Sequence, residues 1–360
     1  MKQIYLMLFI WAAIKNIYAQ DPNFVHTYEN RLFLNPALCS DDSKLRFSYF
    51  NRNLYRPIKG PFSTNSFSLE YPLCGQNIAF GLSFLDENQG DGFLRSQTFN
   101  LGIACHFKLG VLNMPKKISS IKKNSRLNWL QDNYPENWFL FLGLSGDAIQ
   151  NDLNWDNYIF SDQLHPIYGN INASANQNLL RNNELGIGYN GGVSILGVNY
   201  NETFFVDIGA SLFHPFNTVK IGIIKDYELP YRMQLHLRIR KKKQDNEKKK
   251  HNYYQLILKY DQQSNFRNIL INPIYYLNDL FSIGIGYKGS FSSFGNSHSP
   301  LINLSLELHD NFLIKGAYEI STNGLNVMGA GNTFELGLNF EFEKKCRKSS
   351  KSKRNDCPKF

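Results

Sequence analysis

Apolar and polar residues alternate along most of the chain, and this alternation predicts β-strands. The clearest segment is near the carboxyl end, where one face carries Phe334, Leu336, Leu338, Phe340 and Phe342. The opposite face carries Glu335, Gly337, Asn339 and Glu341. A period of two is typical of a strand with one apolar and one polar side. Because the same pattern recurs along the chain, the sequence predicts an all-β protein.

We expect about fourteen antiparallel strands joined by tight turns on one side and mostly longer loops on the other. The expected strands lie near residues 44–51, 64–71, 76–85, 96–109, 136–147, 185–198, 202–213, 230–240, 252–261, 265–277, 279–290, 299–308, 311–320 and 332–343. An even number of strands returns the chain to the side on which it began. The loops expected on the outer side include residues 148–184, as is typical of outer-membrane barrels.

The composition of one predicted strand favours a barrel over a soluble β-sandwich. Near residues 230–240 the apolar face is Tyr231, Met233, Leu235, Leu237 and Ile239. The polar face is Arg232, Gln234, His236, Arg238 and Arg240. That much charge is unsuited to a dry core but suits a water-filled lumen. We therefore predict a transmembrane outer-membrane β-barrel with both termini in the periplasm.

The amino end predicts export. A short basic start, Met1-Lys2-Gln3, precedes an apolar run over residues 4–14 and a small residue, Ala19, at a cleavage position. We expect a signal peptide at 1–19, a periplasmic segment at 20–43, a barrel at 44–343 and a basic periplasmic tail at 344–360. The predicted location is the outer membrane.

Composition agrees with a barrel rather than a helical membrane protein. The 360 residues are 42% hydrophobic, and the mean hydropathy is −0.36. After the predicted signal peptide, no apolar run approaches the roughly 18 residues that a spanning helix needs. In a barrel only alternate residues face lipid, so ordinary hydropathy is expected.

Positive charge is concentrated in three segments. One lies at 116–126, one at 238–250 and one in the tail from residue 343, and the strand order places all three on the periplasmic side. Solvated turns explain such runs, and so does a docking surface for an acidic periplasmic partner. The candidate docking residues are Lys241, Lys242, Lys243, Lys248, Lys249, Lys250, Lys344, Lys345, Arg347 and Lys348. We expect no nucleic-acid partner, because an exported barrel does not meet nucleic acid.

Motifs for catalysis and cofactors are weak. Residues 284–289 match a dinucleotide-binding pattern but fall inside a predicted strand and open no helix. Residues 86–92 have calcium-like acidic spacing without the final carboxylate or flanking helices of an EF-hand. No Gly-x-Ser-x-Gly sequence is present, and no histidine pair has metal-ligand spacing beside a cysteine or carboxylate cluster. We predict a non-enzymatic protein with no catalytic residues, metal or cofactor.

Five cysteines are expected to meet an oxidising compartment. Cys105 shares a strand face with apolar residues and is interpreted as an apolar filler. Two disulfides are possible, Cys346–Cys357 and Cys39–Cys74. Four cysteines permit three connectivities, and the sequence does not select one of them.

Several short segments resemble, in order and spacing, the PorP/SprF family of type IX secretion outer-membrane proteins of Bacteroidetes. These segments are Gln20-Asp21-Pro22-Asn23-Phe24, Leu34-Asn35-Pro36-Ala37-Leu38, Tyr49-Phe50-Asn51-Arg52, 60–64, 90–92, 153–155, 160–163, Gly169, 331–335 and 357–360. Glu335, Gly337, Phe340 and Phe342 also resemble the signal by which barrel-assembly machinery recognises a final strand.

The resemblance implies a non-enzymatic role in type IX secretion and gliding motility. The chain would either scaffold the periplasmic ring of the machine or anchor a secreted surface adhesin, and ring proteins, the adhesin and outer-membrane lipid would be its partners. An alternative is a porin-like channel for small anionic solutes, since Arg232, His236, Arg238 and Lys288 are expected to face the lumen.

Overall fold

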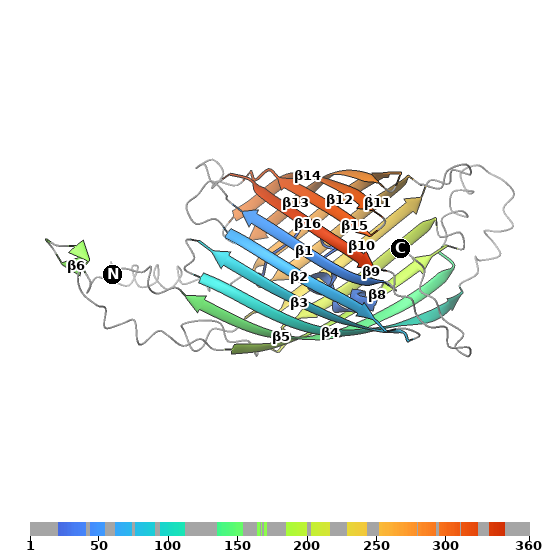
Figure 1. The fold of residues 1–360 in the computed structure, drawn as a ribbon, viewed down its shortest axis with the longest axis horizontal. Coiled ribbons are helices and arrows are strands. Elements are labelled where there is room, and N and C mark those ends of the chain that lie inside the picture. The colour runs from blue at the N-terminus through green and yellow to red at the C-terminus, as the bar shows by residue number, and fades with distance from the viewer. Residues whose placement is uncertain are drawn as a thin grey trace, which may run out of the picture.

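The computed structural model describes residues 21–40, 44–54, 62–73, 76–90, 94–111, 135–153, 164–165, 167, 169–170, 185–199, 203–216, 229–242, 252–278, 280–292, 295–309, 311–322 and 331–342. Fourteen antiparallel strands form one closed barrel (Figure 1). The alternating segments of the sequence are thus confirmed as a barrel of the outer-membrane type. Among the described residues, no helix has the length and apolar character needed to cross a membrane.

The barrel strands follow one another in chain order around the wall. They are β1 (Leu45–Leu54), β2 (Phe62–Pro72), β3 (Ile78–Gln89), β4 (Leu94–Val111), β5 (Asn137–Leu153), β8 (Leu185–Val198), β9 (Phe204–Phe213), β10 (Arg232–Lys242), β11 (Tyr253–Gln263), β12 (Phe266–Leu277), β13 (Phe281–Ser292), β14 (Gly295–His309), β15 (Phe312–Glu319) and β16 (Thr333–Phe342). Two short strands, β6 (Leu164–His165) and β7 (Gly169–Asn170), pair separately between β5 and β8.

The first and last strands close the barrel. β1 pairs with β16 from Leu45 opposite Phe342 to Asn53 opposite Phe334. Closure pairs the backbone groups of every wall strand on both sides, which is what a strand needs to lie in lipid. The dinucleotide-like segment at 284–289 lies inside β13, as expected for a fortuitous match.

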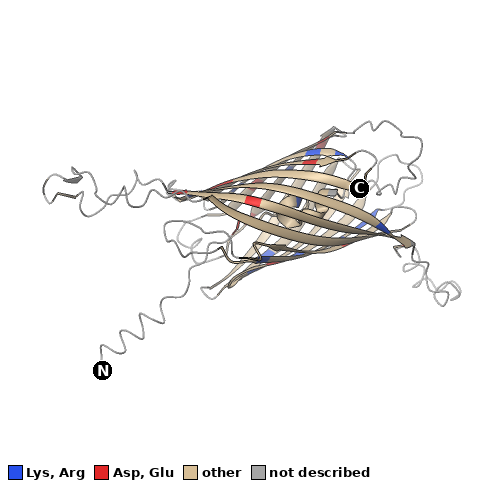
Figure 2. Cartoon of the chain, turned by 90° about the horizontal axis from the view of Figure 1, so that it is seen from below, with Lys and Arg blue, Asp and Glu red and all other residues tan. Residues whose placement is uncertain are grey.

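The side chains alternate between a lipid-like outer face and a polar inner face. On β16, Phe334 and Phe342 are exposed, whereas Glu335 and Asn339 are almost completely buried. Most strand positions are neither acidic nor basic (Figure 2). The expected division of the final strand into an apolar and a polar face is confirmed.

The amino-terminal residues do not stay outside the barrel. Residues 21–40, here called the plug, contain the helical turn α2 (Arg31–Leu34) and the 3-10 helix η1 (Pro36–Ser40), both of which lie inside the lumen (Figure 1). Nearly all of residues 24–39 are buried. Our expectation of a periplasmic segment at 20–43 is therefore corrected for these residues, because their side chains pack against the inward face of the strands.

The plug runs from one end of the barrel to the other. We call the rim where β1 begins and β16 ends the carboxyl mouth, and the rim where β11 turns into β12 the distal mouth. Asp21 lies at the distal mouth, where its backbone N–H donates to Gln263 Oε1 over 2.8 Å. Lys44 lies at the carboxyl mouth, 2.7 Å from Glu341 Oε2. The two ends of the described chain, Asp21 and Phe342, thus lie at opposite mouths. The termini themselves lie outside the described residues, so their expected place in the periplasm stays a prediction.

Candidate functional site: the plugged lumen

A single carboxylate holds the first part of the plug. Glu335 on β16 accepts hydrogen bonds from two consecutive backbone amides, Val25 N–H at 2.8 Å and His26 N–H at 2.9 Å. Its Oε2 also lies 3.2 Å from Arg52 Nη1. Bonds from backbone amides to an ionised carboxylate are about twice as strong as neutral ones. Glu335 therefore fixes both the position and the direction of the chain at this point.

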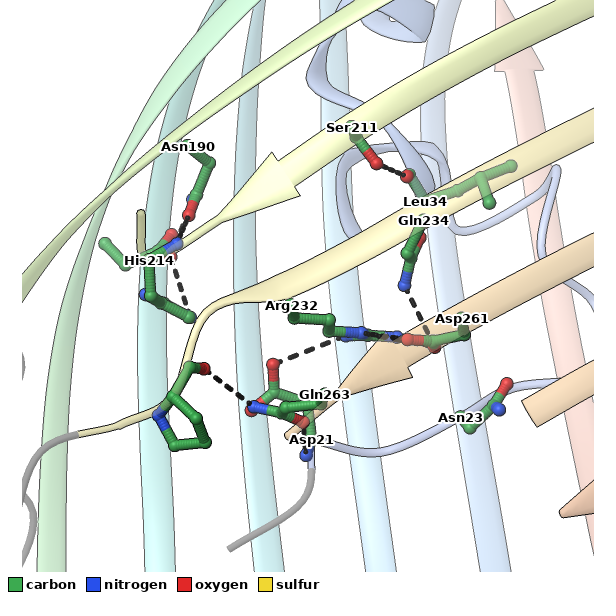
Figure 3. Close-up of polar contacts among 12 residues, drawn as sticks. Asp21, Asn23, Leu34, Asn190, Ser211, His214, Arg232, Gln234, Asp261 and Gln263 are labelled. Atoms are coloured by element: carbon green, nitrogen blue, oxygen red, sulfur yellow. Dashed lines mark hydrogen bonds and ion pairs between the residues drawn. The ribbon is translucent and has the colours of Figure 1, made fainter. Parts of the chain in front are cut away.

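Polar side chains of β10 and β11 fix the plug near the distal mouth (Figure 3). Arg232 donates to both oxygens of Asp261, at 3.0 and 2.7 Å, and its Nη1 lies 3.5 Å from Asp21. Lys259 Nζ donates to Asn23 Oδ1 over 2.5 Å. These side chains come from the strand whose charge first indicated a barrel, and from the strand paired with it.

A second ionic group continues this network along the wall. Lys288 donates to the carbonyl of Asn23 over 2.9 Å and lies 3.4 Å from Glu319. Glu319 also accepts from Arg52 over 2.5 Å. Positive and negative side chains alternate, so the buried charges are paired with one another, as a low-dielectric interior requires.

Asn35 anchors the middle of the plug. Its Nδ2 lies 3.0 Å from the carbonyl of Val193 and 3.2 Å from that of Ala210, and 3.0 Å from His236 Nε2. Its Oδ1 accepts from the backbone N–H of Ala37 over 2.9 Å. The Asn-Pro-Ala sequence is therefore a turn that binds the wall on one side and starts η1 on the other.

Tyr28 joins the plug to the same wall residue. Its hydroxyl is 2.8 Å from His236 Nδ1, and the Arg238 guanidinium lies 4.3 Å from the centre of its ring. Arg238 is in turn 3.2 Å from Asp207 on β9. His236 thus contacts two plug residues through its two ring nitrogens.

Glycines in the wall make room for the plug. At Gly143 on β5 an added Cβ would lie 2.6 Å from Ala37 Cα, and at Gly192 on β8 it would lie 2.8 Å from Asn35 Cγ. Real Cβ atoms do not approach other atoms so closely, so η1 can pack against these strands only where the side chain is absent.

Apolar plug residues occupy separate pockets of the lumen. Val25 packs with Leu270, Leu301 and Ala317. Leu34 and Leu38 join a cluster with Ile257 and Ile274, and Ala37 joins one lined by aromatic side chains of β5 and β9. Each buried aliphatic side chain contributes about 1.5–3 kcal/mol relative to an exposed one. The plug is therefore a packed element rather than a strand of polar residues in water.

Two further ion pairs hold α2 and the residues before it. Arg31 Nη1 lies 3.4 Å from Glu70 Oε2, and Lys315 pairs with Glu29. Burial alone would raise the pKa of Glu29, but the neighbouring Lys315 ammonium lowers it to about 2. Glu29 therefore remains ionised at any ordinary pH.

The expected water-filled lumen is wrong for the strand near 230–240. Arg232, His236 and Arg238 face inward as expected, and so does Lys288, but all four are buried and contact the plug or its partners. Charge can be buried on this face because carboxylates and backbone carbonyls of the plug and wall are placed opposite it.

The residues expected to form a docking surface are only partly described. Lys241 and Lys242 end β10 at the carboxyl mouth, and Lys242 lies over the ring of Phe205. The other candidate positions, Lys243, Lys248, Lys249, Lys250, Lys344, Lys345, Arg347 and Lys348, lie outside the described residues. The strand order does attach the segments at 112–136 and 243–252, and the chain after Phe342, to the carboxyl mouth.

The cysteine and assembly predictions have mixed outcomes. Cys39 is a free thiol buried among Leu32, Ala79 and Ala104, so the open pairing with Cys74 is corrected. Cys74, Cys346 and Cys357 lie outside the described residues. Cys105 is also a free thiol.

Two residues of the expected assembly signal have a role in the lumen. Glu335 binds the plug, and an added Cβ at Gly337 would lie 2.6 Å from Phe50 Cδ1. Phe340 and Phe342 face outward, and the ring of Phe340 stacks on Phe312 with centroids 4.4 Å apart. Contacts inside the lumen, with the plug for Glu335 and with Phe50 of β1 for Gly337, thus account for these two residues without reference to assembly.

Sequence reasoning did not identify the plug as a site. It treated residues 20–43 as a periplasmic segment and used residues 20–24 and 34–38 as family markers. A usable signal was present: Val25, Leu32, Leu34 and Leu38 form an apolar set outside any predicted strand, and such residues need a surface to cover them.

Three solved barrels are similar to this chain at low identity. CdiB from Acinetobacter baumannii is 9% identical with a TM-score of 0.41, and the match covers 83% of this chain and 60% of CdiB. The KdgM porin is 9% identical with a TM-score of 0.36, and the match covers 82% of this chain and 99% of the porin. The outer membrane protein Omp33 of Acinetobacter baumannii is 8% identical with a TM-score of 0.38, and the match covers 83% of this chain and 99% of Omp33. This chain therefore spans about three fifths of CdiB.

Family comparison gives a more direct result. No curated protein matches the sequence. The family described as "Type IX secretion system membrane protein PorP/SprF" matches residues 16–340, which include the plug and all of the wall except the last two residues of β16. The chain belongs to the PorP/SprF family of type IX secretion system membrane proteins.

Proposed function

We propose that this chain is a closed, non-enzymatic outer-membrane scaffold of the type IX secretion apparatus. Its barrel is embedded in lipid, its carboxyl mouth faces the periplasm, and its basic segments there bind an acidic component of the secretion machine. A secreted adhesin held at the opposite mouth is the second partner expected from the family resemblance.

The observation that carries this proposal is the filled lumen. A conduit needs an open path, whereas residues 24–39 are packed between the inner walls from mouth to mouth. With the lumen occupied by its own chain, the surfaces left for partners are the two rims and the connections that leave them.

Charge at the carboxyl mouth supports an acidic partner. Arg240 lies over the ring of Tyr253, and Lys242 over that of Phe205, so aromatic rings hold both cations at this rim. Further basic residues follow in the segments attached to the same rim. Attraction between such charges falls within about 8 Å at physiological ionic strength, so the association should weaken steeply with salt.

Co-purification tests the scaffold. We expect the native barrel to retain a periplasmic ring component at low salt, and a variant with the lysines at 241–243 and 248–250 changed to Glu to lose it while still assembling. Arg267→Glu, a charge reversal on the outward face of β12 next to the distal mouth, is the matched control and should retain the partner. Equal retention by all three barrels at moderate salt would exclude docking through the basic rim.

An anion channel remains the weaker alternative. The inward-facing side chains of Arg232, His236, Arg238 and Lys288 suggested it, but in this structure each contacts the plug. Planar-bilayer recordings distinguish the two functions: a scaffold is silent at neutral pH, and a porin conducts steadily.

A further inference from the structure

The hydrogen bonds of Asn35 fix which way its amide points. The oxygen accepts from the N–H of Ala37, and the nitrogen faces the carbonyls of Val193 and Ala210. With the amide in this orientation, an NH₂ group lies 3.0 Å from His236 Nε2. Two donors cannot bond to each other, so a hydrogen bond at this contact requires an unprotonated Nε2, with the two amide hydrogens shared among Nε2 and the two carbonyls.

The tautomer of His236 follows. When Nε2 accepts, the neutral ring carries its hydrogen on Nδ1, which then donates to the Tyr28 hydroxyl 2.8 Å away. A second proton, on Nε2, would place an N–H against the NH₂ group of Asn35. The contact that joins the middle of the plug to β10 would become a repulsion between two donors.

The ring has no room to turn away from this conflict. His236 is 3% exposed, and it packs on Gly209 of β9, where an added Cβ would lie 2.5 Å from its Cε1. Relief must therefore come from movement of the plug.

We propose that His236 is a pH-sensitive latch: its neutral form holds residues 28–35 of the plug against the wall, and its protonated form releases them. The scaffold proposed above needs only a closed lumen at neutral pH, so the latch goes beyond it and can fail independently.

The charges around His236 are consistent with such a latch. Lys259 lies directly opposite on β11, and Arg238 is two residues along β10 over the Tyr28 ring. Gly209 is opposite on β9, and the nearest carboxylate of that strand, Asp207, is paired with Arg238. From the plug, uncharged Tyr28 and Asn35 face the ring. Lys259 is itself 3.9 Å from Asp261 on β11, so an imidazolium would add a third positive charge to a group that already holds two cations and two carboxylates.

Other titratable groups of the plug set the controls. Glu29 stays ionised in the tested range because Lys315 overcomes the effect of burial and lowers its pKa to about 2. Burial lowers the pKa of His26, which makes His26 a rival for any response to acid. His214, buried 3.8 Å from Asp147, is the other histidine of the described lumen that must be tested.

Planar-bilayer conductance of the full chain measures release. We expect the native barrel to be closed at pH 7.5 and to show at least a tenfold longer open time at pH 5.0. His236→Gln should stay closed at both values, because a Gln oxygen can accept from Asn35 and cannot be protonated. His26→Gln and His214→Gln are matched controls and should open like the native barrel.

Nitrogen NMR of ¹⁵N-histidine gives a readout that does not depend on a variant holding its plug. We expect His236 to be the neutral Nδ1–H tautomer at pH 7.5 and to titrate with the same midpoint as conductance. An Nε2–H tautomer, a barrel that stays closed at pH 5.0, or a His236→Gln barrel that opens like the native one would overturn the latch.

Discussion

Anchoring of the plug depends on a few residues, and Glu335 is a wall carboxylate that binds the plug backbone directly. It binds two amides of the plug and one guanidinium of the wall. Its neighbours leave it no solvent to replace those bonds, since it is 1% exposed. Changes here should therefore act on the plug before they act on the barrel.

Glu335→Gln should loosen the plug while leaving the barrel assembled. Replacing the ionised acceptor removes charge-assisted bonds worth about 1.5–3 kcal/mol, or about ten- to a hundredfold in the open fraction. Labelling of Cys39 by a maleimide, in a chain whose other cysteines are Ser, measures that fraction. Glu341→Gln is the control on the same strand, because Glu341 pairs with Lys44 and Arg46 at the rim. Equal labelling of both variants would contradict the role given to Glu335.

Gly143→Ala should displace η1 from its socket. The new methyl group would overlap the backbone of Pro36 and Ala37, and overpacking of this kind costs about 1–3 kcal/mol. Gly146→Ala on the same strand is the control, because the nearest atom to its added Cβ is 3.8 Å away. Limited proteolysis of the plug should be faster only in the first variant. Identical digestion of the two would mean that η1 is not seated on β5.

At the scale of residues, sequence identified which side chains face inward but not what they contact. Period two places Arg232, His236 and Glu335 on the polar face because alternate side chains of a strand point to opposite sides. Their partners are hundreds of positions away in the chain, as in the bond from Val25 to Glu335. A local sequence pattern therefore cannot predict which of these residues contact one another.

Among the elements, β16 closes the barrel and has two faces with separate roles. Its inner face binds the plug and Phe50, and its outer face presents Phe334, Leu336 and Phe342 to lipid. Substitutions on the inner face should therefore affect binding of the plug, and substitutions on the outer face should affect assembly of the barrel.

Phe342→Asp should lower the amount of assembled barrel rather than release the plug. A charge on a lipid-facing strand costs about 2–4 kcal/mol for basic residues at the midplane, and less for Asp and near the interface. Phe340→Asp should have a similar effect and also remove the stacking on Phe312. The measurement is the folded band on an unboiled gel, with Phe342→Leu as the control. Normal levels of folded band in both Asp variants would contradict the outward placement of these rings.

Elements with strong periodicity could be predicted, whereas the short elements of the plug and their place inside the barrel could not. All fourteen wall strands are eight or more residues long, and alternation along most of them identifies strands without knowledge of their neighbours. The plug has only a four-residue helix and a five-residue 3-10 helix. Elements this short have no periodic signature, and their stability comes from the surrounding wall.

The whole molecule is a barrel threaded by its own amino-terminal segment. Asp21 is at the distal mouth and the chain re-enters the wall at the carboxyl mouth, where Leu45 begins β1. Because the plug is tied to β1 at that rim, it can leave the lumen as a unit only by withdrawal toward the carboxyl mouth. A partner bound at the basic rim is thus on the side from which the plug could be moved.

This arrangement also explains why the two ends of the described chain lie at opposite mouths. An even strand count predicts that both ends of the wall lie on one side, and they do, at Leu45 and Phe342. The count says nothing about a segment that crosses the lumen before the first strand. That crossing moves the described amino end to the other mouth.

Hydrogen exchange of residues 21–40 in the full chain, in a lipid bilayer at neutral pH, tests the central claim most directly. The amides of Val25, His26, Thr27, Asn30, Phe33, Leu34, Asn35, Ala37 and Leu38 are hydrogen-bonded inside the barrel. A packed plug predicts that they exchange as slowly as amides of the wall strands, because exchange needs the segment to leave its site. Exchange of this segment within seconds, beside protected strands, would contradict a plugged lumen.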